Sequence, residues 1–150
     1  MASVSGQKRV VCSRKVVIEA DVTLEEVSNQ EFDMIVLPGG LKGAESFRDC
    51  EQLQSMLRKQ REEKKHLAAI CASPAVAMEP LIGHSKATCY PSFMEKLRNP
   101  SEERVVVEEG GKLVTSRSPG TAIEFALSLV QILFGRPKAE EVAKAMLHKL

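Results

Sequence analysis

The sequence predicts an α/β protein with an open, mostly parallel sheet that is covered by helices on both faces. Two short apolar runs, Met34–Leu37 and Leu67–Ile70, end in turn residues and have the length of buried strands. Segments with apolar residues at helical spacing follow both runs, and this alternation favours parallel pairing. No repeat, linker or low-complexity segment interrupts the sequence, so residues 1–150 are expected to form a single domain.

The first thirty residues predict a small hairpin and a short helix. Val10–Val11 and Val16–Ile18 are rich in β-branched residues and flank the turn-like segment Cys12–Lys15. Asp21–Glu26 is expected to be helical, because Thr23 is followed three residues later by a glutamate, as in a capping box. This opening is more polar than the strong buried strand that usually begins a doubly wound domain.

The middle of the chain predicts two helices and a tight turn. Apolar residues at helical spacing predict a helix within Asp49–Lys65. After the strand that ends at Ile70, Ser73 and Pro74 offer an N-cap and a first helical residue. The helix that they begin is expected to run through Met78 and to be limited by the proline at position 80.

The last third of the chain predicts a strand, a hairpin and two helices. Lys86–Cys89 is expected to be a short strand. Val105–Val107 and Lys112–Thr115 flank a pair of glycines, which is a strong hairpin signal. An apolar helix is expected over Thr121–Phe134, closed by a glycine, and an amphipathic helix over Ala139–Leu147.

The composition excludes several classes of function. With 43% hydrophobic and 27% charged residues and a net charge of +1, the chain has the make-up of a soluble globular protein. We therefore expect neither a nucleic-acid partner nor a membrane partner. The four cysteines show no CxxC spacing, so no metal site is expected. Free thiols and the lack of a secretory signal predict a cytoplasmic location, with the nucleus and the plastid as alternatives.

Cys71 is the strongest candidate for chemistry. It lies between a predicted strand end and a predicted helix start, where a tight turn exposes the side chain and the helix N-terminus favours a thiolate. Gly39 and Gly40 follow the other apolar run and allow close approach of the backbone. Their amides, with that of Ala72, are placed to bind an anion. Spacing alone leaves open that Cys71 is only a small buried hydrophobe.

Three motifs in the same order resemble the ThiJ/PfpI superfamily. They are the segment Leu37–Gly40, the segment Ala68–Ala72 with Pro74, and the segment Leu113–Thr121 with Glu124-Phe125. Within that superfamily, the chain is similar to the protein deglycase DJ branch, and to plant-type members most of all. The similarity covers the chain from about Val10 to its C-terminus.

The resemblance implies a flavodoxin-like three-layer sandwich, a homodimer and chemistry without a cofactor. It implies that Cys71 is the nucleophile and that the amides of Gly40 and Ala72 stabilise an oxyanion. The implied activity is that of a glyoxalase III-like lyase or deglycase on small α-oxoaldehydes such as methylglyoxal. The alternative is a redox sensor or chaperone-like dimer, without catalysis, in which Cys71 is oxidised.

The chain also departs from the family pattern. The opening strand and helix of the family, which carry its acid/base glutamate, have no counterpart here, so the fold is expected to be incomplete at its N-terminus. Tyr90 stands where several members have histidine, and we expect it to bind substrate as a hydrogen-bond donor, because tyrosine is a poor base at neutral pH. Ala72 replaces the histidine of the protease-like members, which argues against a Cys-His peptidase.

The remaining candidates are supporting residues. We expect Arg117, with its neighbours Ser118 and Pro119, to fix the loops around the crevice. The other three cysteines are interpreted as packing residues, with an interface role as the alternative for Cys12 and an approach to the crevice as the alternative for Cys89.

Overall fold

A four-stranded mixed sheet forms the centre of the computed structural model, which describes residues 1–149. Strands β5 (Met34–Leu37), β6 (His66–Ile70) and β8 (Leu113–Ser116) are parallel, in the order β5-β6-β8. Strand β7 (Val105–Glu108) pairs antiparallel with β8 at the far edge. The predicted α/β class with a mostly parallel sheet is therefore confirmed.

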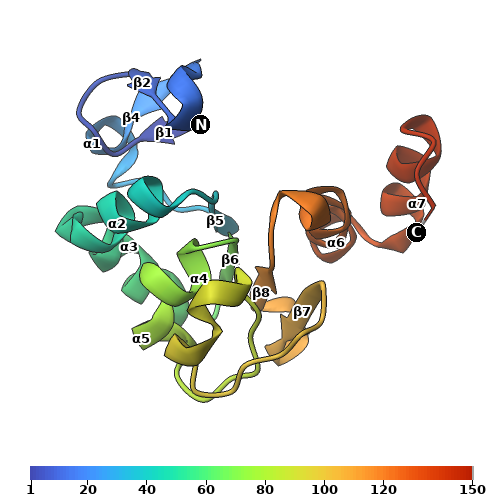
Figure 1. The fold of residues 1–150 in the computed structure, drawn as a ribbon. Coiled ribbons are helices and arrows are strands. Elements are labelled where there is room, and N and C mark those ends of the chain that lie inside the picture. The colour runs from blue at the N-terminus through green and yellow to red at the C-terminus, as the bar shows by residue number, and fades with distance from the viewer. Residues whose placement is uncertain (150) are drawn as a thin grey trace.

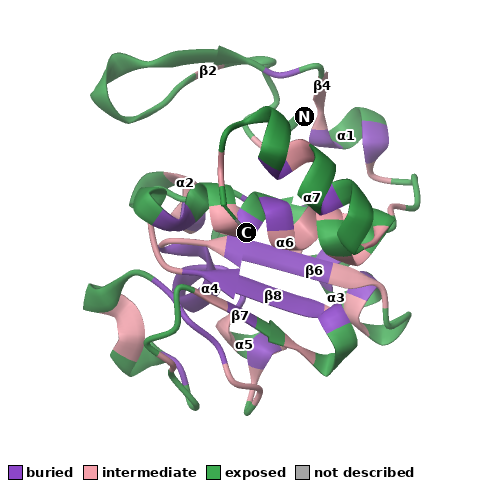
Figure 2. Cartoon of the chain, turned by 90° about the vertical axis from the view of Figure 1, so that its right-hand side faces the viewer, coloured by how far each residue is buried: buried purple, intermediate pink, exposed green. Residues whose placement is uncertain are grey.

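Helices cover both faces of this sheet because the side chains of its central strand alternate between two apolar clusters. Leu67 and Ala69 belong to one cluster, and Ala68 with its neighbour Ile70 belongs to the other. In Figure 2 the central strands β6 and β8 are coloured as buried along most of their length. Small alanines in β6 let helices approach from either side, as a sheet between two helical layers requires.

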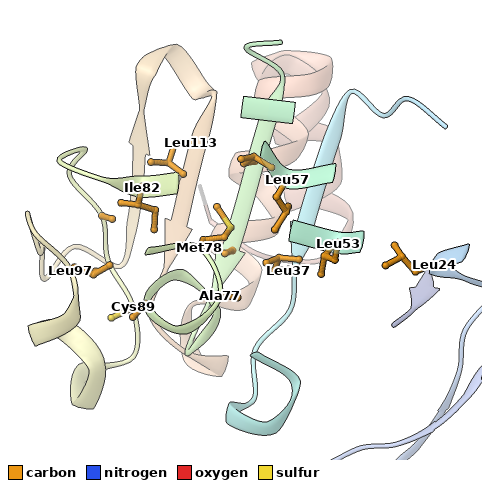
Figure 3. Close-up of a cluster of buried hydrophobic side chains, with 14 residues drawn as sticks. Leu24, Leu37, Leu53, Leu57, Ala77, Met78, Ile82, Cys89, Leu97 and Leu113 are labelled. Atoms are coloured by element: carbon orange, nitrogen blue, oxygen red, sulfur yellow. The ribbon is translucent and has the colours of Figure 1, made fainter. Parts of the chain in front are cut away.

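The larger cluster lies under the helices that follow β5 and β6. Helix α3 (Glu51–Glu62) contributes Leu53 and Leu57 to this cluster, and Met78 joins it from between the short helices α4 (Ser73–Val76) and α5 (Glu79–Ile82) (Figure 3). On the other face, α6 (Ala122–Phe134) buries Phe125 against the sheet. Helix α7 (Arg136–Ala145) packs on α6, at the opposite end of the view in Figure 1 from the N-terminus.

The N-terminal segment forms two small ribbons beside the main sheet (Figure 1). The predicted hairpin is confirmed, with β2 (Arg9–Val11) antiparallel to β3 (Val17–Glu19). A parallel pair, β1 (Ala2–Ser3) with β4 (Val22–Thr23), was not expected. The predicted capping box holds the start of α1 (Leu24–Val27). Short 3-10 turns complete the chain at Ser13–Lys15, Pro91–Lys96, Glu109–Gly111 and Pro119–Thr121.

Two predictions about the strands are wrong. The run Met34–Leu37 is a strand, but it is not buried on both faces: β5 is an edge of the four-stranded sheet, and Val36 is 42% exposed. The segment Lys86–Cys89 is not a strand, since only a single bridge joins Ala87 to Pro100. Two backbone hydrogen bonds join Ala87 to Asn99 and Ser101, and the pairing extends no further.

Three helix predictions also need correction. Helix α2 (Leu41–Asp49) was missed, because two glycines near its start weaken its helical pattern. Pro80 does not simply end a helix but sits in the first turn of α5, where its missing N–H costs nothing. The last helix begins at Arg136, three residues before the predicted start. None of the helices in residues 1–149 has both the length and the apolar character needed to cross a bilayer.

Candidate active site

Cys71 occupies a strained turn between β6 and α4. Its φ is +67°, a left-handed conformation that residues other than glycine adopt at a cost of about 1 kcal/mol or more. Two main-chain hydrogen bonds hold it there: its N–H donates to the Ser116 carbonyl at 2.9 Å, and its carbonyl accepts from the Tyr90 N–H at 2.8 Å. The turn is therefore fixed both by β8 and by the loop after α5.

Gly39 packs directly against the Cys71 side chain. A methyl group added at Gly39 would lie 2.6 Å from Cβ of Cys71 and 3.4 Å from its Sγ. Because real carbon contacts are longer than 2.6 Å, only glycine fits at position 39 without a shift of the turn. The ends of β5 and β6 therefore meet at the thiol, as the prediction for open parallel sheets requires.

Ser73 has a different role from the predicted N-cap. Ala72 is the residue before the first turn of α4, and the buried Ser73 hydroxyl donates instead to the Pro38 carbonyl. This bond joins the start of α4 to the turn after β5. A buried hydrogen bond of this kind stabilises the fold, because breaking it would leave the Pro38 carbonyl unpaired at a cost of about 1–3 kcal/mol.

Two backbone amides are free, one in the Cys71 turn and one in the residue after Gly39. Gly40, with φ of +99°, precedes α2, and Ala72 precedes α4. Neither of their N–H groups donates to any protein group within residues 1–149. Amides left unpaired at helix starts carry partial positive charge and bind anions. The geometry agrees with the oxyanion role expected for Gly40 and Ala72, which stays a prediction.

Tyr90 lies beside Cys71, to which its main-chain N–H donates, and the residue is 43% exposed. The Tyr90 and Phe93 ring centroids are 6.3 Å apart at a tilted angle, and the Lys96 ammonium lies 5.5 Å from the Phe93 ring centroid. This arrangement puts an aromatic surface next to the Cys71 turn. Across the described part of the chain, no side chain forms a hydrogen bond with Sγ of Cys71.

The loop after β8 is held by its own polar residues. Arg117 donates to the Glu102 carbonyl at 2.9 Å, and thereby ties this loop to the segment before β7. The Ser118 side chain and Thr121 form a capping box around the turn that begins at Pro119. Both contacts agree with the expected supporting role of residues 117–119, and neither reaches the thiol.

The other cysteines have different surroundings. Cys12 is exposed on the β2–β3 hairpin, and Cys50 is half-buried between α2 and α3. Cys89 is completely buried in the larger core cluster, near Leu97 (Figure 3). Burial, which disfavours the thiolate, raises the pKa of Cys89 to about 11. Cys89 therefore packs in the core, despite its place next to Tyr90.

Sequence reasoning missed the bond from Ser73 to Pro38 and the helix after Gly40. The spacing of Leu41, Ala44 and Phe47 would have indicated that helix. No local pattern indicates the bond, because its two partners are 35 residues apart.

The close packing at Gly39 gives a testable prediction. Gly39→Ala is expected to destabilise the fold by about 1–3 kcal/mol through overpacking, and to slow the reaction of Cys71 with a thiol reagent. Chemical denaturation and timed labelling measure the two effects. In the control Gly43→Ala, the new methyl group would meet only the Phe47 ring at 3.9 Å, so stability should rise by up to about 1 kcal/mol. Equal behaviour of the two variants would contradict the packing argument.

Comparison with known proteins agrees with this geometry. Residues 1–132 match the DJ-1/PfpI family. The chain is 48% identical over 151 residues to protein DJ-1 homolog B of Arabidopsis thaliana, and the match covers 98% of this chain and 34% of that protein. The structure of oxidized Toxoplasma gondii DJ-1 superposes with a TM-score of 0.95 at 40% identity, covering 99% of this chain and 82% of that one.

A third relative is named for an activity. The glutathione-independent glyoxalase DJR-1.2 of Caenorhabditis elegans is 32% identical over 146 residues, which cover 95% of this chain and 77% of that protein. The chain spans about a third of the length of the two Arabidopsis relatives, at 34% and 38%. The match over residues 1–132, the shared fold and these identities together establish that the chain belongs to the DJ-1/PfpI family.

Proposed function

We propose that this chain is a cysteine-dependent glyoxalase or deglycase that acts on small α-oxoaldehydes such as methylglyoxal and needs no cofactor. The observation that carries the proposal is the strained Cys71 turn, which is followed by the unpaired amide of Ala72 and packed against Gly39, the residue before the unpaired amide of Gly40. The name of the C. elegans relative, a glutathione-independent glyoxalase, supports this class of reaction.

In the proposed reaction, the Cys71 thiolate attacks the aldehyde carbon of methylglyoxal and forms a carbon–sulfur bond. The carbonyl electron pair moves to oxygen, and the amides of Gly40 and Ala72 stabilise that oxyanion as it gains a proton to give a hemithioacetal. The proton on this carbon is then removed and returned to the neighbouring carbonyl carbon by way of an enediol, while the hydroxyl proton passes to the neighbouring oxygen, and this isomerisation leaves a thioester. Water cleaves the thioester, releases lactate and restores the thiol, so that the net change is addition of one water.

The proton transfer needs a general acid/base near the thiol. The Tyr90 hydroxyl suits hydrogen-bond donation more than proton abstraction, given a reference pKa of about 10. We therefore assign only the nucleophile and the oxyanion donors to residues of this chain. Measured turnover of methylglyoxal would show that a general base is also present.

Cys71→Ser is expected to abolish methylglyoxal consumption, because a hydroxyl without an adjacent base is a far weaker nucleophile than a thiolate. The assay follows loss of methylglyoxal and formation of lactate without glutathione. Cys50→Ser is the matched control, since Cys50 is also half-buried but lies between α2 and α3, and its turnover should equal that of the unchanged chain. Turnover that survives in Cys71→Ser would refute the proposal.

A redox sensor is the second candidate function. The solved T. gondii relative is described as oxidized, which supports oxidation chemistry in this family. In this chain the half-buried Cys71 is accessible to a small peroxide, whereas Cys89 is buried and its pKa is raised. A peroxide would transfer one oxygen to the Cys71 thiolate to give a sulfenate, and a second to give a sulfinate.

Under mild peroxide, Cys71 is expected to gain oxygen before the other three cysteines do. Peptide mass spectrometry of samples taken over time measures the order. The buried Cys89 serves as an internal control, because burial raises the pKa of its thiol to about 11. Uniform oxidation of all four cysteines would argue against a sensor.

The homodimer and the cytoplasmic location belong to the same proposal. Exposed apolar residues on the β2–β3 hairpin support an interface there, namely Val11, Val16, Val17 and Ile18. Four free cysteines agree with a reducing compartment.

A further inference from the structure

We infer that Phe93 sets a size limit for the substrates of Cys71, so that the site takes α-oxoaldehydes with a small substituent such as methyl and rejects those with an aryl group. This inference rests on the proposed function and names the residue that defines its substrate class. It is drawn from the place of the Phe93 ring at two helix starts and from the small side chains around that ring.

The main chain ties Phe93 to the nucleophile. The Tyr90 N–H donates to the Cys71 carbonyl at 2.8 Å, and the Phe93 N–H donates to the Tyr90 carbonyl at 2.9 Å. Phe93 lies in the 3-10 turn Pro91–Lys96, which starts directly after Tyr90. Two hydrogen bonds in series therefore hold this 3-10 turn beside the Cys71 turn.

The Phe93 ring lies where α2 and α4 begin. It is partly buried and packs against the junction cluster, which consists of Ala44, Ala72 and Val76. Ala72 is the residue after the nucleophile. The Ala44 N–H donates to the Gly40 carbonyl at 2.9 Å, so Ala44 closes the first turn of α2. The ring is therefore next to both helix starts whose free amides are proposed to bind the oxyanion.

The Phe93 ring fills the space that small side chains leave at this place. Two of the three residues in the junction cluster are alanines, and all three are buried. The Lys96 ammonium lies over the ring at 5.5 Å from its centroid, and the Tyr90 ring centroid is 6.3 Å away. Because protein interiors are close-packed, an aryl group cannot enter this space while the ring occupies it.

The geometry of the proposed adduct directs the substrate's substituent toward this ring. Sγ of Cys71 bonds to the aldehyde carbon, while the oxygen on that carbon accepts from the free amides at the two helix starts. Gly39 packs against the Cys71 side chain and closes the side of β5. The rest of the substrate therefore extends toward the side that Tyr90 and Phe93 line, where a methyl group needs far less room than a phenyl group.

The alternative role for a ring beside a thiol is a stacking surface that attracts aryl groups. A stacking surface needs an open ring face. The Phe93 ring packs against the junction cluster, and the Lys96 ammonium lies over it, so its surroundings are already filled. The observations therefore favour exclusion by size over stacking, and the two roles predict opposite preferences for an aryl reagent.

The test alkylates Cys71 with two α-chloroketones, chloroacetone and 2-chloroacetophenone, which copy the carbon skeletons of methylglyoxal and phenylglyoxal. In each reaction the thiolate bonds to the CH2 carbon and chloride leaves, so no turnover is required. Peptide mass spectrometry measures the rates at Cys71 and at the exposed Cys12 of the same chain. The ratio of these two rates, Cys71 to Cys12, removes the intrinsic reactivity of each reagent.

In the unchanged chain, this ratio is expected to be about tenfold lower for 2-chloroacetophenone than for chloroacetone. Phe93→Ala opens an apolar space that can take an aryl group, so the difference between the reagents should shrink to about twofold or less. Phe47→Ala is the matched control, because Phe47 is also partly buried but packs against the larger core cluster. This control should keep the discrimination of the unchanged chain.

Equal discrimination by Phe93→Ala and the unchanged chain would overturn the inference, as would an unchanged chain that shows no preference or that prefers 2-chloroacetophenone. Circular dichroism checks that the variants fold. Should Phe93→Ala lose its structure, Phe93→Leu keeps an apolar side chain but removes the ring, and should reduce the discrimination by about half or more; unaltered discrimination would then contradict the size limit. Because alkylation needs no turnover, a chain without glyoxalase activity still gives these ratios, so the two failures are distinguishable.

Discussion

The Cys71 turn depends on a pair of main-chain hydrogen bonds that hold a non-glycine residue at positive φ. Cys71 forms hydrogen bonds with the Ser116 carbonyl in β8 and with the Tyr90 N–H in the loop after α5. Gly39 packs against its side chain. A left-handed cysteine persists only where its surroundings over-determine it. The strand order β5-β6-β8, the close packing of Gly39 and the hydrogen bond from Ser73 to Pro38 together hold the turn in place.

The same arrangement explains why the four cysteines differ. Cys89 precedes Tyr90, which donates a hydrogen bond to the turn. Its own side chain is buried in the core, and this burial raises the pKa of its thiol. Cys12 is more exposed than Cys71 but lies on a hairpin without comparable constraint. Exposure alone would favour Cys12, so the case for Cys71 depends on local geometry and on the free amides beside it.

Local patterns predicted the elements that depend on neighbours in sequence. The strand Met34–Leu37, the hairpin across Gly110–Gly111 and the capping box at Thr23 all appear as expected. Features that depend on distant partners were missed or wrong. The segment Lys86–Cys89 has a strand's composition but no ladder, and the exposure of Val36 reflects the absence of a neighbouring strand. The position of Cys71 at the turn was predictable from sequence, whereas its hydrogen bonds with Ser116 and Tyr90 were not.

The central claim is that the fold, and not exposure, makes Cys71 the reactive thiol. Brief alkylation with iodoacetamide, in buffer and again in concentrated urea, followed by peptide mass spectrometry, tests it most directly. The account predicts that Cys71 is modified faster than the exposed Cys12 in the native chain, and that the difference disappears on unfolding. Faster modification of Cys12 in the native chain, or a preference for Cys71 that survives in urea, would contradict the claim.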